Sequence, residues 1–162
     1  MRLRRLSAAL LPLAFTACLS GSDYNSSITA PNIPIEQTTF ASSLNVDLSK
    51  STKTPSGMYI RQLVAGTGAA ATAASTVSVY YEGFLANGFR FDYQLSPSAP
   101  LGPFKLGAKA VIDGFDEGIV GMKVGDKRQL IIPPELGYGP YGFNQIPSNA
   151  VLVFNVELIA VQ

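Results

Sequence analysis

The chain has 162 residues, of which 47% are hydrophobic and 14% charged, with a net charge of +1. This length accommodates one ordinary domain and some additional chain, and the near-neutral charge argues against a nucleic-acid partner, because no basic surplus exists to displace counterions. There is no histidine and a single cysteine, Cys18. Catalytic pairs that need histidine, internal disulfides, and histidine or multi-cysteine metal sites are therefore excluded, and we expect neither a metal nor a cofactor.

Residues 1–18, MRLRRLSAALLPLAFTAC, have the form of an export signal. Three arginines precede a mostly apolar stretch from Leu6 to Phe15, which is too short to span a bilayer. Small residues then lead to Cys18, as in a bacterial lipoprotein signal, whose cysteine is lipidated and becomes the mature N-terminus. An ordinary signal peptide cut nearby, with Cys18 incidental, is the alternative. We expect an exported protein that is lipid-anchored to a bacterial membrane, on the periplasmic side with the outer membrane favoured, or to the cell surface.

The chain between this signal and the first clear strand divides into two parts. After a signal peptide at residues 1–17, residues 18–35 are predicted to be a flexible tether, because they are rich in Ser, Asn and Pro and have no apolar period. Residues 36–56 are an N-terminal extension. Its apolar residues suit either a short strand or a segment that docks on the domain: Phe40, Leu44, Val46 and Leu48.

Residues 57–162 are predicted to form one strand-rich domain. A strand at 58–64 is followed by a second at 76–85, in which Val77, Val79 and Tyr81 share one face. The pair Asn87–Gly88 is a strong hairpin signal and returns the chain through residues 89–93. Residues 94–103 contain three prolines and are expected to be a loop that leads into residues 104–107.

Residues 113–122 are the only convincing helix. Asp113 can cap its N-terminus, and Phe115, Ile119 and Met122 form one apolar stripe. The two glycines at 118 and 121 let this helix lie close to a sheet.

The last part of the domain returns to strands. A strand at 127–132 stops at two prolines, and residues 135–149 form a long loop. The final strand, 151–159, alternates, with Val153 outward and Leu152, Phe154, Val156 and Leu158 inward. Strands wrapped around one short helix give an α+β fold, a curved antiparallel half-barrel.

Short motifs occur in a fixed order from about Gly57 to the C-terminus. They are VYYEG at 79–83, GxxFD at 88–92, LG at 106–107, VIxGFDEG at 111–118, MxVG at 122–125, GYG at 137–139, IP at 146–147 and LxFxVEL at 152–158. In this order and spacing they resemble the FKBP-type peptidyl-prolyl cis-trans isomerases. The fold of that family is a curved antiparallel sheet wrapped around a short helix, in agreement with the strand and helix pattern.

The resemblance implies a proline-binding pocket. By position, its catalytic residues would be Tyr81, Phe91, Asp92, Ile112, Phe115 and Tyr138, and its further substrate-binding residues would be Phe104, Val111, Ile146 and Phe154. Phe115 would be the floor, where the family usually has Trp. The Tyr138 hydroxyl would donate a hydrogen bond to one substrate carbonyl, and the backbone N–H of Ile112 would hold another.

The activity implied by the resemblance is rotation of X-Pro bonds during the folding of exported proteins. Its partners would be proline-containing polypeptides and macrolide inhibitors of the family, and we expect a monomer. Rotation breaks amide resonance against a barrier of about 18–20 kcal/mol but makes no new bond, so it needs neither a nucleophile nor a metal.

Other interpretations remain at this point. The same fold can serve as a non-catalytic chaperone or binding module for unfolded or proline-containing segments, and an adhesive β-domain would have no apolar cleft. Individual residues also have simpler explanations: Asp92 as a turn acid paired with Arg90, and Tyr138 as a solvent-facing loop residue.

Overall fold

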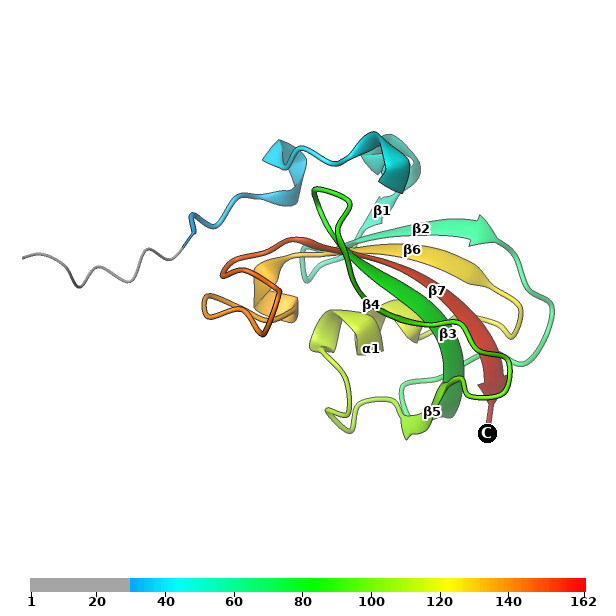
Figure 1. The fold of residues 1–162 in the computed structure, drawn as a ribbon. Helices are drawn as coiled ribbons and strands as arrows, with labels where there is room; N and C mark the ends of the chain where they lie inside the picture. Colours follow the sequence, from blue (N-terminus) through cyan, green and yellow to red (C-terminus); the bar gives the residue numbers. More distant parts are fainter. Residues whose placement is uncertain (1–29) are drawn as a thin grey trace, which may run out of the picture.

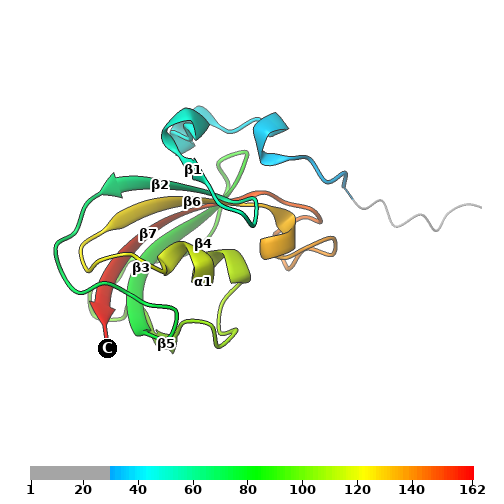
Figure 2. The same ribbon diagram turned by 180° about the vertical axis from the view of Figure 1, so that it is seen from behind.

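The computed structural model describes residues 30–162, so the predicted signal and Cys18 lie outside the described residues. Seven strands form one antiparallel sheet in the order β1-β2-β6-β7-β3-β4, with β5 also paired to β3. The sheet curves around one short helix, α1 (Asp113–Ile119), which lies in its concave face (Figures 1 and 2). The predicted α+β half-barrel is confirmed. The strands are Thr52–Lys53 (β1), Tyr59–Val64 (β2), Thr76–Leu85 (β3), Arg90–Gln94 (β4), Leu101–Lys105 (β5), Lys127–Ile132 (β6) and Leu152–Val161 (β7).

Strand β5 departs from the prediction, which has a loop over residues 94–103. Strand β3 is longer than its hairpin partner β4, and β4 leaves the sheet at Gln94. The edge of β3 that β4 leaves unpaired is taken by β5, where Val77 pairs with Phe104 and Val79 with Leu101. A proline lacks a backbone N–H and is tolerated at such a sheet edge. The local composition therefore indicated a loop, whereas the vacant edge of β3 makes a strand.

The helix is shorter than predicted and begins differently. It ends at Ile119, and Ile112 occupies the N-cap position without a side-chain cap, so the prediction that Asp113 caps the helix was wrong. The Asp113 carboxylate instead accepts a hydrogen bond from the Lys109 ammonium at 2.6 Å. The apolar stripe is confirmed: Phe115, Ile119 and Met122 are all buried.

Two glycines on the face of α1 that meets β6 allow the helix to lie directly on the sheet. A Cβ at Gly118 would overlap the side chain of Leu130, and a Cβ at Gly114 would overlap that of Ile132. The close approach predicted for Gly118 is thus confirmed. Gly121 has another role, because it lies in a turn with φ +78° and has no such close neighbour.

The convex face of the sheet carries a second apolar cluster. Val153, expected to point outward, does face away from α1 but is fully buried. It packs with Ile131 of β6 against Ile35 and Leu44 from the beginning of the described chain. The strand alternation therefore identified the face correctly, and the covering segment explains the burial.

This covering segment, residues 30–50, is called the N-terminal segment below. It crosses the convex face in three 3₁₀ turns, Ile35–Gln37 (η1), Ser42–Leu44 (η2) and Leu48–Lys50 (η3), so it docks rather than forming a strand (Figure 1). The Glu36 carboxylate accepts hydrogen bonds from Lys53 and from the Tyr59 hydroxyl, both at 2.6 Å. No helix within residues 30–162 is long and apolar enough to cross a bilayer.

Substitution Leu44→Ala tests whether this docking contributes to stability. Leu44 is 6% exposed within the convex cluster, so the change removes buried apolar contacts and should lower the free energy of unfolding by about 2–5 kcal/mol. Urea unfolding followed by circular dichroism measures it. Val64→Ala, at a side chain that is 48% exposed, is the control and should change stability by less than about 0.5 kcal/mol. Equal stability of the two variants would contradict the docking.

Candidate functional site

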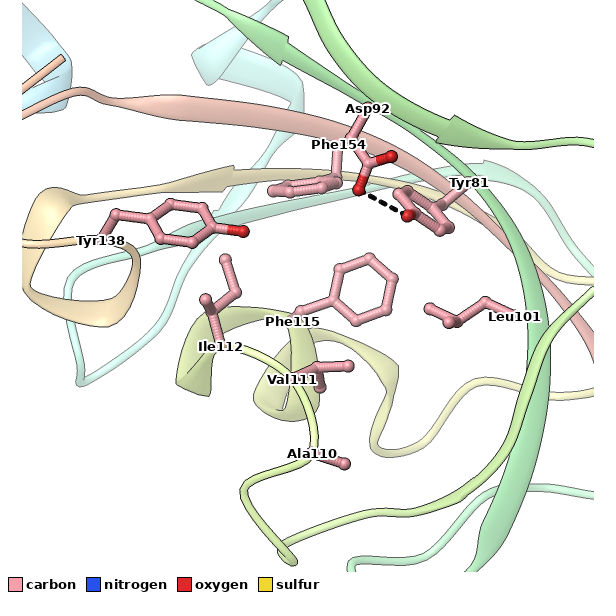
Figure 3. Close-up of a pocket in the computed structure, with 9 residues that line it drawn as sticks. All are labelled: Tyr81, Asp92, Leu101, Ala110, Val111, Ile112, Phe115, Tyr138 and Phe154. Carbon is pink, nitrogen blue, oxygen red and sulfur yellow. Dashed lines mark hydrogen bonds between the residues drawn. The ribbon is translucent and has the colours of Figure 1, made fainter. Parts of the chain in front are cut away.

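A cavity of about 190 Å³ lies between the concave face of the sheet and the beginning of α1 (Figure 3). Strands β3, β4, β5 and β7, the chain before α1, α1 itself and the loop after β6 all contribute to it. Nine residues line it: Tyr81, Asp92, Leu101, Ala110, Val111, Ile112, Phe115, Tyr138 and Phe154. Seven of these are candidates from the sequence, so the structure brings together residues up to 73 positions apart, from Tyr81 to Phe154, around one cavity.

Aromatic rings in mutual edge contact form the inner wall of the cavity. Phe115 is 3% exposed, and its ring centroid lies 5.6 Å from that of Tyr81 and 5.2 Å from that of Phe154, with interplanar angles of 76° and 72°. Phe91 meets Phe154 in the same way at 5.6 Å and 87°. Each such pair contributes about 0.5–1.5 kcal/mol beyond its area burial, so the wall is a firmly held apolar surface.

The glycine of the VYYEG motif is required by this packing. Gly83 pairs with Asp92 on one side and with Phe154 on the other. A Cβ at this position would lie 2.7 Å from the ring of Phe154 and 2.8 Å from that of Phe91. Only glycine allows the two rings to close over β3.

Asp92 holds one of the two hydroxyl groups that face the cavity. The Tyr81 hydroxyl donates a hydrogen bond to Asp92 Oδ2 at 2.7 Å, and the Tyr93 N–H donates to Oδ1 at 2.8 Å. Arg90 bonds to Glu82 at 2.7 Å and not to Asp92, because the register of β3 with β4 shifts between Gly83 and Phe84. The simpler explanation of Asp92 as the partner of Arg90 is therefore wrong.

The two tyrosine hydroxyls differ in whether their proton is already used in a hydrogen bond within the protein. Burial, then the hydrogen bond to Asp92 and its charge, raise the pKa of Tyr81 above its ordinary value of 10.0. Burial, then the charge of Asp92, also raise the pKa of Tyr138. Both groups stay protonated at neutral pH. The Tyr138 hydroxyl points into the cavity (Figure 3), and no acceptor for its proton lies among the described residues, so it is available to a ligand.

A backbone donor lies at the same end of the cavity. Ile112 is the N-cap residue of α1, and its N–H has no hydrogen-bond partner within residues 30–162. The Ile112 side chain and the Tyr138 ring lie next to each other at one end of the cavity (Figure 3). Between 30 and 162, no group of three or more acidic or cysteine side chains is placed to hold a metal ion. The site thus offers two neutral donors above an apolar wall.

The other candidates lie beside the cavity. Phe91 and Ile146 line an adjoining cavity of about 270 Å³, which shares Asp92 and Tyr138 with the first. Phe104 packs partly buried against the core and lines neither cavity. The roles assigned to the site residues remain predictions.

Sequence reasoning missed Leu101 and Ala110 of the first cavity, and Phe143, Asn144 and Gln145 of the adjoining one. Leu101 lies on β5, the unexpected strand, and Ala110 is a small residue directly before the VIxGFDEG motif. Phe143 stacks on Tyr138 with centroids 5.7 Å apart and an angle of 11°. An aromatic residue five positions after Tyr138 in a loop rich in Gly and Pro was the available signal.

Comparisons with known proteins agree with this geometry. The family model for FKBP-type peptidyl-prolyl cis-trans isomerases matches residues 68–159. The FK506-binding protein of Neisseria meningitidis serogroup B is 45% identical over 106 residues, which are 65% of this chain and 96% of that protein. FK506-binding protein 4 of Mycosarcoma maydis is 44% identical over 111 residues, which are 68% of this chain and 29% of that protein.

Two solved structures share the fold over the matched part of the chain. FkpA from Escherichia coli superposes with a TM-score of 0.61 at 37% identity, over 70% of this chain and 52% of that one. AtFKBP13 gives a TM-score of 0.63 at 35% identity, over 69% of this chain and 98% of that one.

Substitution Asp92→Asn tests the electrostatics of the site without reference to any activity. Removing the carboxylate should lower the pKa of Tyr81, which should still stay above its ordinary value because burial, the largest cause, remains. NMR titration of protein labelled at tyrosine Cζ measures this, with Tyr81→Phe to assign the resonance. Glu82→Gln, next to Tyr81 on the other face, is the control and should leave it unchanged. An unaltered Tyr81 titration in Asp92→Asn would contradict the conclusion that the Asp92 carboxylate raises the pKa of Tyr81.

Proposed function

The chain belongs to the FKBP-type peptidyl-prolyl cis-trans isomerase family, and we propose from this that it accelerates X-Pro rotation in polypeptides at the cavity between β3, β7 and α1. The observation that carries the proposal is the composition of that cavity. An aromatic wall, formed by the partly buried Tyr81 and the buried Phe115 and Phe154, lines the same cavity as two unused hydrogen-bond donors, the Tyr138 hydroxyl and the Ile112 N–H. This combination suits a proline ring flanked by peptide carbonyls.

The apolar wall supplies the change in environment that the reaction needs. A planar amide has separated charge from resonance, and a twisted amide has less, so an apolar surface favours the twisted form over the planar one. A ten-thousandfold acceleration requires about 5–6 kcal/mol of such differential stabilisation. Desolvation of the amide together with one or two directed hydrogen bonds is of this size.

The polar groups orient the substrate. Tyr138 and Ile112 donate to carbonyls on either side of the proline, which fixes the chain while the bond rotates. Asp92 acts on the same step through Tyr81, because the hydrogen bond of 2.7 Å between them fixes the Tyr81 ring against Phe115. The Asp92 carboxylate also opposes the approach of the rotating carbonyl oxygen, which confines the rotation to the remaining directions.

A binding module without catalysis is the second candidate. It is favoured by two aromatic side chains on the loop beside the cavity, Tyr141 and Phe143, which are 93% and 59% exposed. Exposed apolar groups next to a pocket suit the retention of unfolded segments. The isomerase assay below separates the two candidates, since only the first requires turnover.

Substitutions Asp92→Val and Tyr138→Phe test the catalytic proposal. Asp92→Val keeps the approximate volume and should lower kcat/KM strongly while changing stability by less than about 1–2 kcal/mol. Tyr138→Phe deletes one hydrogen bond of about 0.5–1.5 kcal/mol, so kcat/KM should fall by up to about tenfold. The measurement is a protease-coupled or NMR assay on a tetrapeptide with one X-Pro bond.

Two further substitutions in the site region complete this assay. Tyr80→Phe, on the opposite face of β3 from Tyr81, should leave kcat/KM unchanged. Phe115→Trp, which restores the residue usual in the family, should leave activity equal or higher. Full activity in a folded Asp92→Val protein would refute the mechanism.

The cellular setting is a separate proposal that rests on residues 1–18 alone. The basic start, short apolar run and Cys18 support export and lipidation. The domain would then be anchored at a bacterial membrane, and its substrates would be exported proteins. Intact-mass spectrometry of protein from a bacterial host with lipoprotein processing should find lipid on Cys18. Cys18→Ser should be released without detergent. Unmodified Cys18 in the wild-type protein would refute lipidation.

A further inference from the structure

We propose that the N-terminal segment positions the loop that carries Tyr138, and that Asn149 is the positioning residue that connects the two. The inference rests on the function proposed above, in which Tyr138 contacts the substrate. The loop comprises residues 133–149, between β6 and β7. In both ribbon views the N-terminal segment lies beside it (Figures 1 and 2).

Asn149 forms one hydrogen bond to the N-terminal segment and one within the loop that carries Tyr138. Its side-chain amide Nδ2 donates to the carbonyl oxygen of Ala30 at 2.5 Å, and the Ala30 N–H donates to Ser148 Oγ at 2.9 Å. Its own N–H donates to the carbonyl oxygen of Gly139 at 2.9 Å. Gly139 directly follows Tyr138. A single residue therefore joins the N-terminal segment to the backbone next to the catalytic hydroxyl.

A second contact holds the other end of the loop. The side-chain amide of Asn32 donates to Glu135 Oε1 at 2.5 Å. Glu135 lies in the 3₁₀ turn Pro134–Leu136 (η4), which leads directly into Gly137 and Tyr138. The N–H of Gly139 donates back to the Pro134 carbonyl at 2.9 Å. The N-terminal segment thus contacts the chain on both sides of Tyr138.

The loop needs such support because it has little regular structure of its own. Apart from η4 it contains no helix or strand. Four of its residues have a positive φ, outside the regular helix and strand conformations: Gly139, Gly142, Asn144 and Asn149. Segments of this kind have low local stability.

The N-terminal segment is itself firmly attached, so it can serve as a fixed support. Ile35 and Leu44 are 3% and 6% exposed in the convex cluster, and Glu36 is bonded to Lys53 and Tyr59. The segment also meets the turn between β3 and β4, where the Ala41 N–H donates to the Ala86 carbonyl at 2.8 Å. That turn leads into β4, which carries Asp92.

The test uses two substitutions at Asn149 in the full chain. Asn149→Asp keeps the size and the tolerance for φ +52° but cannot donate to the Ala30 carbonyl, and Asn149→Gly removes the side chain at the same backbone conformation. Each loses one hydrogen bond, so kcat/KM should fall about three- to tenfold. The Tyr138 Cζ resonance, assigned with Tyr138→Phe, should shift in both variants. Urea midpoints check that both remain folded.

A double-substitution comparison separates positioning from general damage. In the Tyr138→Phe background, the same changes at Asn149 should lower kcat/KM by less than twofold, because the group they position is already lost. The matched controls are Asn45→Asp and Asn45→Gly. Asn45 also has a positive φ, of 49°, and lies in the N-terminal segment away from the loop, so both controls should have wild-type kcat/KM.

The outcomes decide between this inference and the function on which it rests. Wild-type kcat/KM in both Asn149 variants, or an equal loss in the wild-type and Tyr138→Phe backgrounds, would overturn the positioning role. An inactive wild-type protein would refute the proposed function instead, and the Tyr138 resonance would still decide the structural part: an unshifted resonance in both Asn149 variants overturns it.

Discussion

The close contact between α1 and β6 is the constraint on which the rest of the site depends. It is possible only because Gly114 and Gly118 present no side chain toward Ile132 and Leu130. With the helix at this depth, Phe115 reaches the edges of Tyr81 and Phe154, and Ile112 stands at the cavity mouth as the residue before the helix. A helix with any larger residue at these two positions would be lifted from the sheet, and the aromatic wall would separate.

Electrostatics then distinguishes groups that the packing brings together. Tyr81 and Tyr138 are both partly buried, and the same carboxylate acts on both. Asp92 bonds directly to Tyr81 and affects Tyr138 only through its charge, so one hydroxyl is a fixed part of the wall and the other remains available. This division follows from β-strand register: Asp92 pairs with Gly83, two residues from Tyr81 on the neighbouring strand. The register of the β3–β4 hairpin thereby determines which tyrosine hydroxyl is bonded to Asp92 and which one remains available to a ligand.

The features that could be predicted from sequence were those with local, repeated patterns. The bounds of β3 and β6, the turn at Asn87–Gly88 and the stripe on α1 all follow from periodicity or turn chemistry, and the order of motifs located seven of the nine cavity residues. The errors arose where a distant part of the chain decides. Leu101 is in a strand because β4 ends early, and Val153 is buried because the N-terminal segment covers it. The cap is a local error: Asp113 is the first residue of the helix, and Ile112 before it is the N-cap.

Burial of β6 and β7 on both faces also bears on how much of the chain is needed to cover the sheet. The end of β6 and the beginning of β7 form continuous apolar runs, Leu130-Ile131-Ile132 and Val151-Leu152-Val153-Phe154, as expected of strands covered on two sides. The matched family region begins at residue 68, well after the segment that covers the convex face. A fragment cut at that boundary would expose Ile131, Val151 and Val153 together, an apolar patch of the kind that causes self-association. The unit in which both faces of the sheet are covered therefore begins before residue 68, where the matched family region begins.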